Sequence, residues 1–114
     1  GLLQSSGVIY SAFFISMPFY VYILYSPSTD RLYRGQTQNL KDRLIRHNKG
    51  MEKSTDKGAP WTLLWACEMP NRSEACKLEA KLKNLSRQRL LKFMAKYPEH
   101  VCGEEAQAII ASLG

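Results

Sequence analysis

Two tyrosines and an arginine–histidine pair have the types and spacing that could do chemistry on an anionic substrate. Tyr22 and Tyr33 lie in two consecutive segments rich in strand-forming residues, so they would stand on adjacent strands of a hairpin. Arg43 and His47 are four residues apart, which places them on one face of a helix. Packing within a sheet and an exposed basic face are the simpler interpretations, and neither pair is specific by itself.

A carboxylate and a basic loop could serve the same chemistry. Glu79 has Lys83 one helical turn away, and most such pairs are surface salt bridges worth roughly a few tenths of a kcal/mol. Because Glu79 also lies between Leu78 and Leu82 at the edge of an apolar stripe, we expect it to be partly buried. A lone carboxylate beside a basic face suits one Mg²⁺, whose other ligands would be water and a substrate phosphate. The loop 48–61 is basic and could lie along a phosphate backbone.

Other catalytic and metal-binding signatures are absent from the sequence. It contains no GxxxxGK[ST], GxGxxG, GxSxG or HExxH motif. Its three cysteines have no CxxC spacing and only two histidines to join them, so a structural zinc site is not expected. The odd number of cysteines (Cys67, Cys76 and Cys102) fits free thiols in a reducing compartment, and we predict a cytoplasmic protein.

The elements that must position these side chains follow from local patterns. Clusters of aromatic and β-branched residues predict strands at 19–25, 31–35 and 61–67, with a turn at 26–30 and a loop at 50–60. Helices are expected at 39–48 before Gly50, from Asn71 to Leu85, after Ser86 and after Gly103. Apolar residues at helical spacing mark the side of each helix that faces the core: Leu40, Leu44 and Ile45; Ala75, Leu78, Leu82 and Leu85; Leu90, Leu91 and Met94; Ala106, Ile109, Ile110 and Leu113. This order predicts an α/β or α+β domain with a small sheet.

A chain of 114 residues is long enough for one compact domain at most, and its composition is ordinary for a globular protein. We expect this domain to span 17–96, followed by a C-terminal helical extension at 97–114. Residues 1–16 are predicted to be an N-terminal extension, non-native or poorly ordered, with Met17 as the natural start. The apolar stretch 8–15 is too short to span a bilayer, so no membrane association is expected.

The charge of the chain is concentrated in two segments. The net charge is +6, with +5 in residues 31–57, +6 in residues 72–96 and −3 in residues 97–114. If the two basic segments formed one positive face, that face would suit a polyanion such as nucleic acid. A solvated basic surface with no partner is the alternative.

Taken in order, these signals resemble the GIY-YIG nuclease superfamily. The resemblance is carried by Tyr20-Val21-Tyr22, by Tyr33-Arg34-Gly35 ten residues later, and by the run from Asn39-Leu40 through Arg43-Leu44 to His47-Asn48. Thr37, Pro60-Trp61 and Glu79 in Ala75-x-x-x-Glu79-x-x-x-Lys83 add to it. It runs from about Phe19 to Leu85 and points to the stand-alone, single-domain bacterial branch.

The resemblance implies a three-stranded antiparallel sheet flanked by helices. It also implies an endonuclease that cleaves DNA phosphodiesters with Mg²⁺ or Mn²⁺, in DNA repair or recombination. Tyr22 and Tyr33 match the family tyrosines, and Arg43 matches the family arginine. His47 stands where relatives carry His or Tyr, and Glu79 matches the metal-binding glutamate.

The sequence departs from the family pattern at three positions. Tyr20 replaces the first Gly and Arg34 the middle Ile of the second triplet, and both are backbone or packing positions. Gln36 stands where some relatives have Lys, which leaves that electrostatic helper without a counterpart.

The chemistry of each side chain suggests which role it would take at the implied site. The planar fork of Arg43 suits bidentate contact with phosphate oxygens. A free tyrosine has a pKa near 10 and is a poor base unless its phenolate is stabilised. We expect Tyr33 to be the base, with Arg43, Arg34 or the metal stabilising its phenolate and Tyr22 or His47 positioning the water.

Six basic residues are expected to contact DNA phosphates without reading sequence: Arg34, Lys41, Arg46, Lys49, Lys53 and Lys83. Specificity would then come from DNA shape or from a protein partner. A catalytically silent DNA-binding module and a basic protein-interaction domain are the competing hypotheses. The intact set of Tyr22, Tyr33, Arg43 and Glu79 favours the enzyme, and the sequence does not indicate an oligomeric state.

Overall fold

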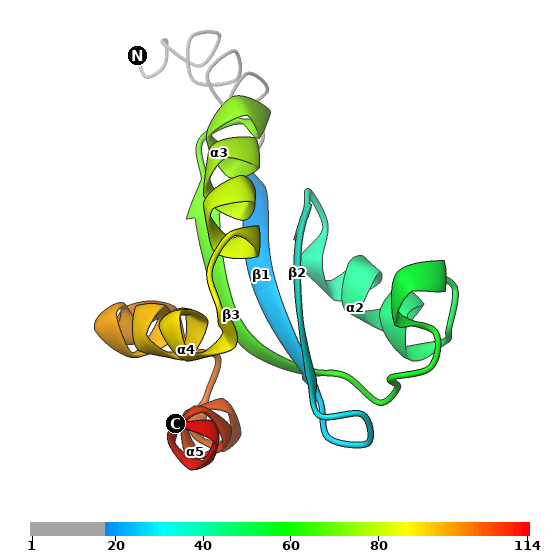
Figure 1. Cartoon of the computed structure of the whole chain (residues 1–114). Coiled ribbons are helices and arrows are strands. Elements are labelled where there is room, and N and C mark those ends of the chain that lie inside the picture. The colour runs from blue at the N-terminus through cyan, green and yellow to red at the C-terminus, as the bar shows by residue number, and fades with distance from the viewer. Residues whose placement is uncertain (1–17) are drawn as a thin grey trace, which may run out of the picture.

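Three antiparallel strands form the sheet of this protein, with the first strand in the middle. The computed structural model describes residues 18–114. Strand β1 (Phe19–Ser26) pairs with β2 (Arg31–Thr37) on one side and with β3 (Thr62–Met69) on the other, in the order β2-β1-β3. Figure 1 shows this sheet flanked by helices, which confirms the predicted α+β fold.

The hairpin between β1 and β2 forms where the turn residues cluster. Asp30 adopts a positive φ of 56°, and its backbone N–H donates to the Ser26 carbonyl at 2.7 Å. Aspartate tolerates this left-handed conformation better than most residues. The resulting register pairs Tyr22 with Gly35 and Leu24 with Tyr33, so both tyrosines project from the same face of the sheet.

Four α-helices and two 3₁₀ helices complete the described chain. The α-helices are α2 (Leu40–Asn48), α3 (Arg72–Lys83), α4 (Arg87–Lys96) and α5 (Glu104–Leu113), and the 3₁₀ helices are η1 (Lys53–Thr55) and η2 (Pro98–His100). Side-chain caps begin three of them, and the sequence predicts the one at Asn71. Asn39, Asn71 and Ser86 each accept a hydrogen bond from the backbone N–H three residues on.

The helices divide between the two faces of the sheet. Helices α3, α4 and α5 cover the face that presents Val21 and Ile23, and they form the larger core. Helix α2 covers the other face through Leu40 and Leu44, which pack against the cluster around Tyr22. Ile45 was expected on the buried side of α2 but is 44% exposed, because it lies one residue beyond the apolar stripe.

This division corrects the expectation of a single positive face. The basic segment 31–57 contains α2 and η1, whereas the segment 72–96 contains α3 and α4 on the opposite face of the sheet. Figure 1 shows α2 and α4 on opposite sides of the strands. The two segments approach each other where α3 contacts β2 and where Arg34 donates to the Leu85 carbonyl.

The C-terminal segment packs onto β3 as part of the same core. Val101 forms an isolated bridge with Trp65, and the Cys102 N–H donates to the Leu64 carbonyl at 2.9 Å. Ala106 and Ile110 of α5 are buried with the rest of the core. The predicted N-terminal extension at 1–16 lies outside the described residues.

Candidate active site

Tyr22, Tyr33 and His47 form a tyrosine–histidine cluster between the sheet and α2. Their ring centroids lie 5.1 to 6.3 Å apart, and all three pairs meet at tilted or edge-on angles. Residue 22 comes from β1, residue 33 from β2 and residue 47 from the last turn of α2. The structure therefore brings together three side chains that the sequence separates by up to 25 residues.

Both nitrogens of the His47 imidazole have partners. The Tyr22 hydroxyl lies 2.9 Å from Nε2, and the Thr55 hydroxyl lies 2.7 Å from Nδ1. Thr55 in turn donates to the backbone carbonyl of Glu52 at 3.3 Å. Because a carbonyl can only accept, this chain is satisfied when Nδ1 of His47 donates to Thr55 and Nε2 accepts from Tyr22.

Gly35 gives the Tyr22 ring its place across β2. A Cβ added at position 35 would lie 2.6 Å from the Tyr22 hydroxyl and 3.0 Å from the Tyr33 ring. Any side chain there would overlap the tyrosines, so only glycine leaves the space that this cluster fills.

Burial sets the protonation states of Tyr22 and His47. It raises the pKa of Tyr22 far above the usual value near 10, and the neighbouring Tyr33 adds to this, while the Arg43 guanidinium beside the phenol opposes it. Burial also lowers the pKa of His47, against the attraction of Glu52. Tyr22 is therefore held as a neutral phenol and His47 as a neutral imidazole.

The Tyr33 hydroxyl differs from that of Tyr22. Within residues 18–114 it takes part in no hydrogen bond, although its ring is held by His47 and by Trp61 at 6.2 Å between centroids. The ring is fixed and the hydroxyl remains available to a bound molecule.

The loop below the cluster is tied to the end of α2. Asn48 accepts from the Trp61 backbone N–H at 2.6 Å, and the Trp61 indole N–H donates to the Thr55 carbonyl at 2.8 Å. These bonds hold Thr55 in position against His47. Thr55 was not singled out from the sequence, because its role depends on the path of this loop.

Glu79 approaches β2 from the α3 side of the sheet. Its side chain is 17% exposed, so Glu79 is partly buried, as expected from the sequence. Gln36 donates to Glu79 Oε1 at 2.7 Å, and Lys83 Nζ lies 3.2 Å from Oε2. Gln36 follows Gly35 in β2, so its side chain points to the face opposite the one on which Gly35 leaves room for the tyrosines. The tyrosine–histidine cluster and Glu79 thus lie on the two sides of one edge strand.

The surroundings of Glu79 fit a Mg²⁺ ion, which takes few of its ligands from protein side chains. Gln36 brings an amide next to the carboxylate, and the Lys83 side chain is 58% exposed, so a cation could displace it. Each carboxylate oxygen has lone pairs beyond those that Gln36 and Lys83 engage. In the described part of the chain no three His, Cys, Asp or Glu side chains gather as a closed metal site. Magnesium commonly needs only one or two carboxylates, with water and phosphate as further ligands.

The structure places Arg34 away from the tyrosines. Its Nη2 donates to the Leu85 carbonyl at 3.0 Å, on the face of β2 opposite Tyr33. Its Nε is buried with no partner in the structure, and burial lowers the pKa of the guanidinium. The expectation that Arg34 stabilises a Tyr33 phenolate is therefore wrong, because successive strand residues face opposite sides.

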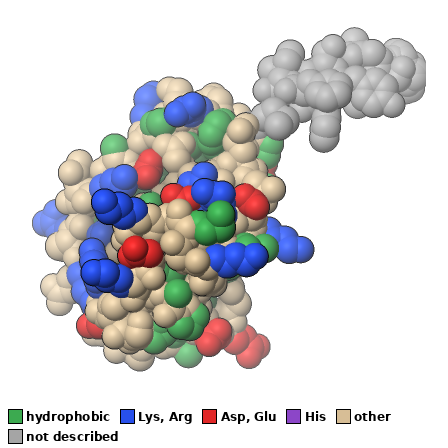
Figure 2. All heavy atoms as spheres, turned by 90° about the vertical axis from the view of Figure 1, so that its right-hand side faces the viewer, with side chains coloured by type: hydrophobic (Ala, Val, Ile, Leu, Met, Phe, Trp, Pro, Cys, Tyr) green, Lys and Arg blue, Asp and Glu red, His purple; other side chains and the backbone are tan. Residues whose placement is uncertain are grey.

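The other residues expected to contact DNA differ in how free they are. Lys41, Lys49 and Lys53 are exposed, and none of the ion pairs found between residues 18 and 114 involves them. Arg46 pairs with Glu52 at 2.9 Å, and Lys83 pairs with Glu79. Figure 2, which views the molecule from the α2 side, shows basic side chains spread over this face with acidic ones between them.

No helix in residues 18–114 has the length and apolar character needed to cross a membrane. The three cysteines are free thiols, as expected.

Comparisons with known proteins identify the family of this chain. The model of the GIY-YIG catalytic domain matches residues 18–92. A UPF0213 protein of Pectobacterium carotovorum is 33% identical over 84 residues, covering 73% of this chain and 84% of the relative. A UPF0213 protein of Staphylococcus saprophyticus is 33% identical over 78 residues, covering 68% of this chain and 94% of the relative.

A solved structure is also similar. The solution NMR structure of a UPF0213 protein from Bacillus halodurans is 30% identical, covers 69% of this chain and 84% of that one, and superposes with a TM-score of 0.47. The family match spans both tyrosines, the α2 residues and Glu79, which confirms the resemblance found in the sequence. The chain belongs to the GIY-YIG nuclease family, among its small bacterial UPF0213 members.

Proposed function

We propose that the protein is a divalent-metal-dependent endonuclease that hydrolyses DNA phosphodiester bonds, acting in DNA repair or recombination. The observation that carries this proposal is the tyrosine–histidine cluster, in which two side chains are locked together and Tyr33 keeps an uncommitted hydroxyl. Arg43 adds a positive charge beside the cluster, and Glu79 stands across the edge strand.

Three residues of the cluster and its rim have distinct roles in this proposal. Arg43 binds a non-bridging oxygen of the scissile phosphate and stabilises the negative charge that develops there. As the phenolate, Tyr33 accepts the proton of the attacking water, and Arg43 beside the cluster would stabilise that phenolate. Tyr22 is unsuited to that task, since burial and its bond to His47 keep it protonated.

His47 and Tyr22 position the Tyr33 side chain and take no part in the reaction themselves. Their hydrogen bond fixes the Tyr22 ring over Gly35, and the Tyr33 ring packs against both. This packing restricts the direction in which the Tyr33 hydroxyl can point, and such fixed orientation contributes to rate.

Glu79, supported by Gln36, would hold the divalent cation. When bound there, Mg²⁺ or Mn²⁺ supplies Lewis-acid stabilisation of charge on the phosphate and the leaving oxygen. Gln36 orients the carboxylate from β2, while Lys83 balances its charge in the absence of other cations.

Exposed bases on the α2 side would bind the DNA backbone without regard to sequence. Lys41, Lys49 and Lys53 are free for this, and Arg46 can contribute by exchanging its carboxylate partner. Lys83, at the end of α3, would add a contact from the other face of the sheet. Such binding weakens steeply with salt. Sequence or structure preference would come from DNA shape or from a protein partner.

The proposal is tested with a panel of labelled DNA structures incubated with Mg²⁺, Mn²⁺ or EDTA. We expect metal-dependent nicking by the wild type and its loss in Glu79→Gln. Glu74→Gln is the matched control, since it removes an ion pair with Lys77 on the same helix but away from β2. Equal products from Glu79→Gln and wild type would refute the proposal, and DNA binding without any metal-dependent product would indicate a DNA-binding module instead.

A further inference from the structure

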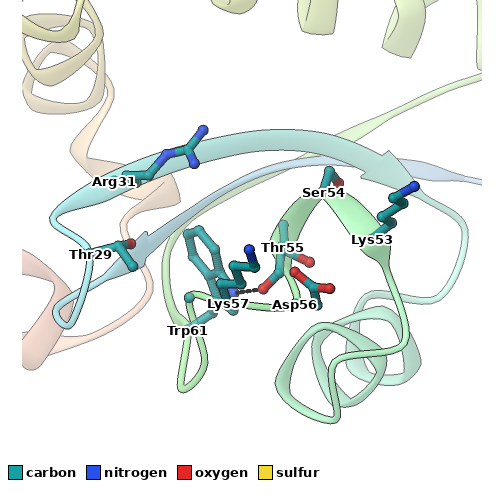
Figure 3. Close-up of a pocket in the computed structure, with 9 residues that line it drawn as sticks. Thr29, Arg31, Lys53, Ser54, Thr55, Asp56, Lys57 and Trp61 are labelled. Atoms are coloured by element: carbon teal, nitrogen blue, oxygen red, sulfur yellow. Dashed lines mark hydrogen bonds between the residues drawn. The ribbon is translucent and has the colours of Figure 1, made fainter.

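A polar pocket of about 280 Å³ lies between the β1–β2 turn and the loop that carries η1. Figure 3 shows Thr29 and Arg31 on one side, Lys53 and Ser54 on the other, and Lys57 between them. The two walls come from segments that are more than 20 residues apart in the sequence. Neither the family tyrosines nor Glu79 line this pocket.

The floor of the pocket is fixed by buried hydrogen bonds. The fully buried Ser26 hydroxyl donates to the Gly58 carbonyl at 2.6 Å and accepts from the Thr29 backbone N–H at 3.2 Å. Ser26 therefore ties the turn to the loop. A Cβ at position 58 would overlap the Trp61 ring, so the loop can pass this close only with glycine there. A pocket held in this way is organised before any ligand arrives.

The pocket carries a net positive charge from side chains that form no ion pair within residues 18–114. Arg31, Lys53 and Lys57 are exposed, and each is absent from the ion pairs formed by residues 18–114. Asp56 is the one carboxylate among the lining residues, so three cations face one anion. The neighbouring Arg46 and Arg87 are already paired with Glu52 and Asp30. Three free cations around a rigid polar floor suit a phosphate group.

The pocket shares two walls with the tyrosine–histidine cluster. Thr55 lines the pocket and contacts His47 Nδ1 at 2.7 Å, and Trp61 lines the pocket and packs against Tyr33. A polyanion bound at the cluster would therefore lie close to the pocket. Consecutive phosphates of a nucleic acid strand provide such closely spaced negative charges.

We propose that this pocket binds a backbone phosphate of the nucleic acid, distinct from the phosphodiester placed at Tyr33. This inference rests on the proposed function, because it takes the substrate from it. Arg31 and Lys57 are the principal phosphate contacts, and Lys53 contributes charge at the rim. The pocket thereby sets the position of the strand relative to the cluster.

Binding to a labelled DNA in EDTA tests the proposal without cleavage. Arg31→Gln/Lys57→Gln should bind roughly three- to tenfold more weakly than wild type, and the slope of log K against log[salt] should fall by about 0.9, as for one lost phosphate contact. The matched control is Arg89→Gln/Lys92→Gln, which removes the same charge from exposed positions on α4. It should retain the wild-type slope.

A scan with neutral methylphosphonate linkages, placed one at a time along the strand, locates the contact. Wild type and control should lose affinity at one flanking position at which Arg31→Gln/Lys57→Gln is insensitive. If the pocket variant and the control behave alike, or no position distinguishes them, the inference is wrong even when wild type cleaves DNA with Mg²⁺. If wild type neither binds nor cleaves DNA, the proposed function fails and the inference fails with it.

Discussion

The Tyr22 hydroxyl lies 2.9 Å from Nε2 of His47, and both side chains are almost wholly buried between β1 and α2. A buried phenol and a buried imidazole each need a partner, and here each satisfies the other. This contact joins the sheet to α2 and sets the back wall against which Tyr33 packs.

Tyr33→Phe should reduce metal-dependent DNA cleavage by roughly 10²- to 10⁴-fold, the range of a general base, with little change in DNA affinity. The substitution removes only a hydroxyl that has no partner in the described structure. Single-turnover cleavage and equilibrium binding should be measured on the same substrate. Tyr97→Phe, on the far side of the sheet, is the control and should cleave at the wild-type rate. Equal rates for the two variants would exclude Tyr33 as the base.

Thr55→Val should destabilise the fold by about 1–3 kcal/mol, because it leaves Nδ1 of the buried His47 without a partner. Cleavage should also slow, since His47 then no longer holds Tyr22 in one orientation. Thr55→Ser restores the hydroxyl and should recover both properties. Urea unfolding and cleavage rates measure the two effects. Stability and rate that stay at the wild-type level in Thr55→Val would show that the His47 contact is dispensable.

Gly35→Ala should destabilise the protein by about 1–3 kcal/mol and abolish most cleavage. The new Cβ would sit 2.6 Å from the Tyr22 hydroxyl, and the buried ring cannot move without breaking its bond to His47. Thermal unfolding gives the stability, and a crystal structure would show whether the ring is displaced. A variant with unchanged melting temperature would mean that the cluster is loosely packed.

Stability should fall as the pH drops below about 6.5. The folded pKa of His47 is lowered, so the unfolded chain binds this proton more readily. The contribution of the neutral imidazole is complete above pH 6.5 and is lost as the pH falls from there to the folded pKa. The slope reaches up to about 1.4 kcal/mol per pH unit.

Urea unfolding at several pH values between about 7.5 and 5.5 measures this slope. The groups that face His47 are Glu52, Arg43 and Arg46, and the carboxylate opposes the shift while the two guanidinium groups add to it. In His47→Asn the slope over this range should be smaller, whatever the variant's overall stability. An equal slope in wild type and variant would assign it to other groups.

Local patterns predicted most of the fold because they act over a few residues. The aromatic run in β1 and the caps Asn39, Asn71 and Ser86 each lie beside the element that they specify. The alternation of β2 also predicts the placement of Arg34. Arg34 stands between Tyr33 and Gly35, so a period of two already directs it to the other face.

The parts of the site that could not be predicted depend on tertiary placement. Thr55 reaches His47 only because Asn48 and Trp61 fix the path of the intervening loop. The contact of Gln36 with Glu79 joins residues 43 apart, through the docking of α3 on β2. Neither contact can be recognised from the spacing of residues in the sequence. The pocket between the β1–β2 turn and the η1 loop likewise combines two distant segments, which the hydrogen bond from Ser26 to the Gly58 carbonyl ties together.

The bridge between Val101 and Trp65 has a consequence for self-association. An open sheet has two margins of unpaired backbone amides, and each can recruit a strand from another molecule. The segment that precedes α5 occupies part of the margin along β3, and Cys102 adds a hydrogen bond to Leu64 there. This segment follows residues 18–92, which match the family model. Among the described residues, the margin along β2, which lies between the tyrosine cluster on one face and Glu79 on the other, has no such bridge and stays open to a strand of another molecule.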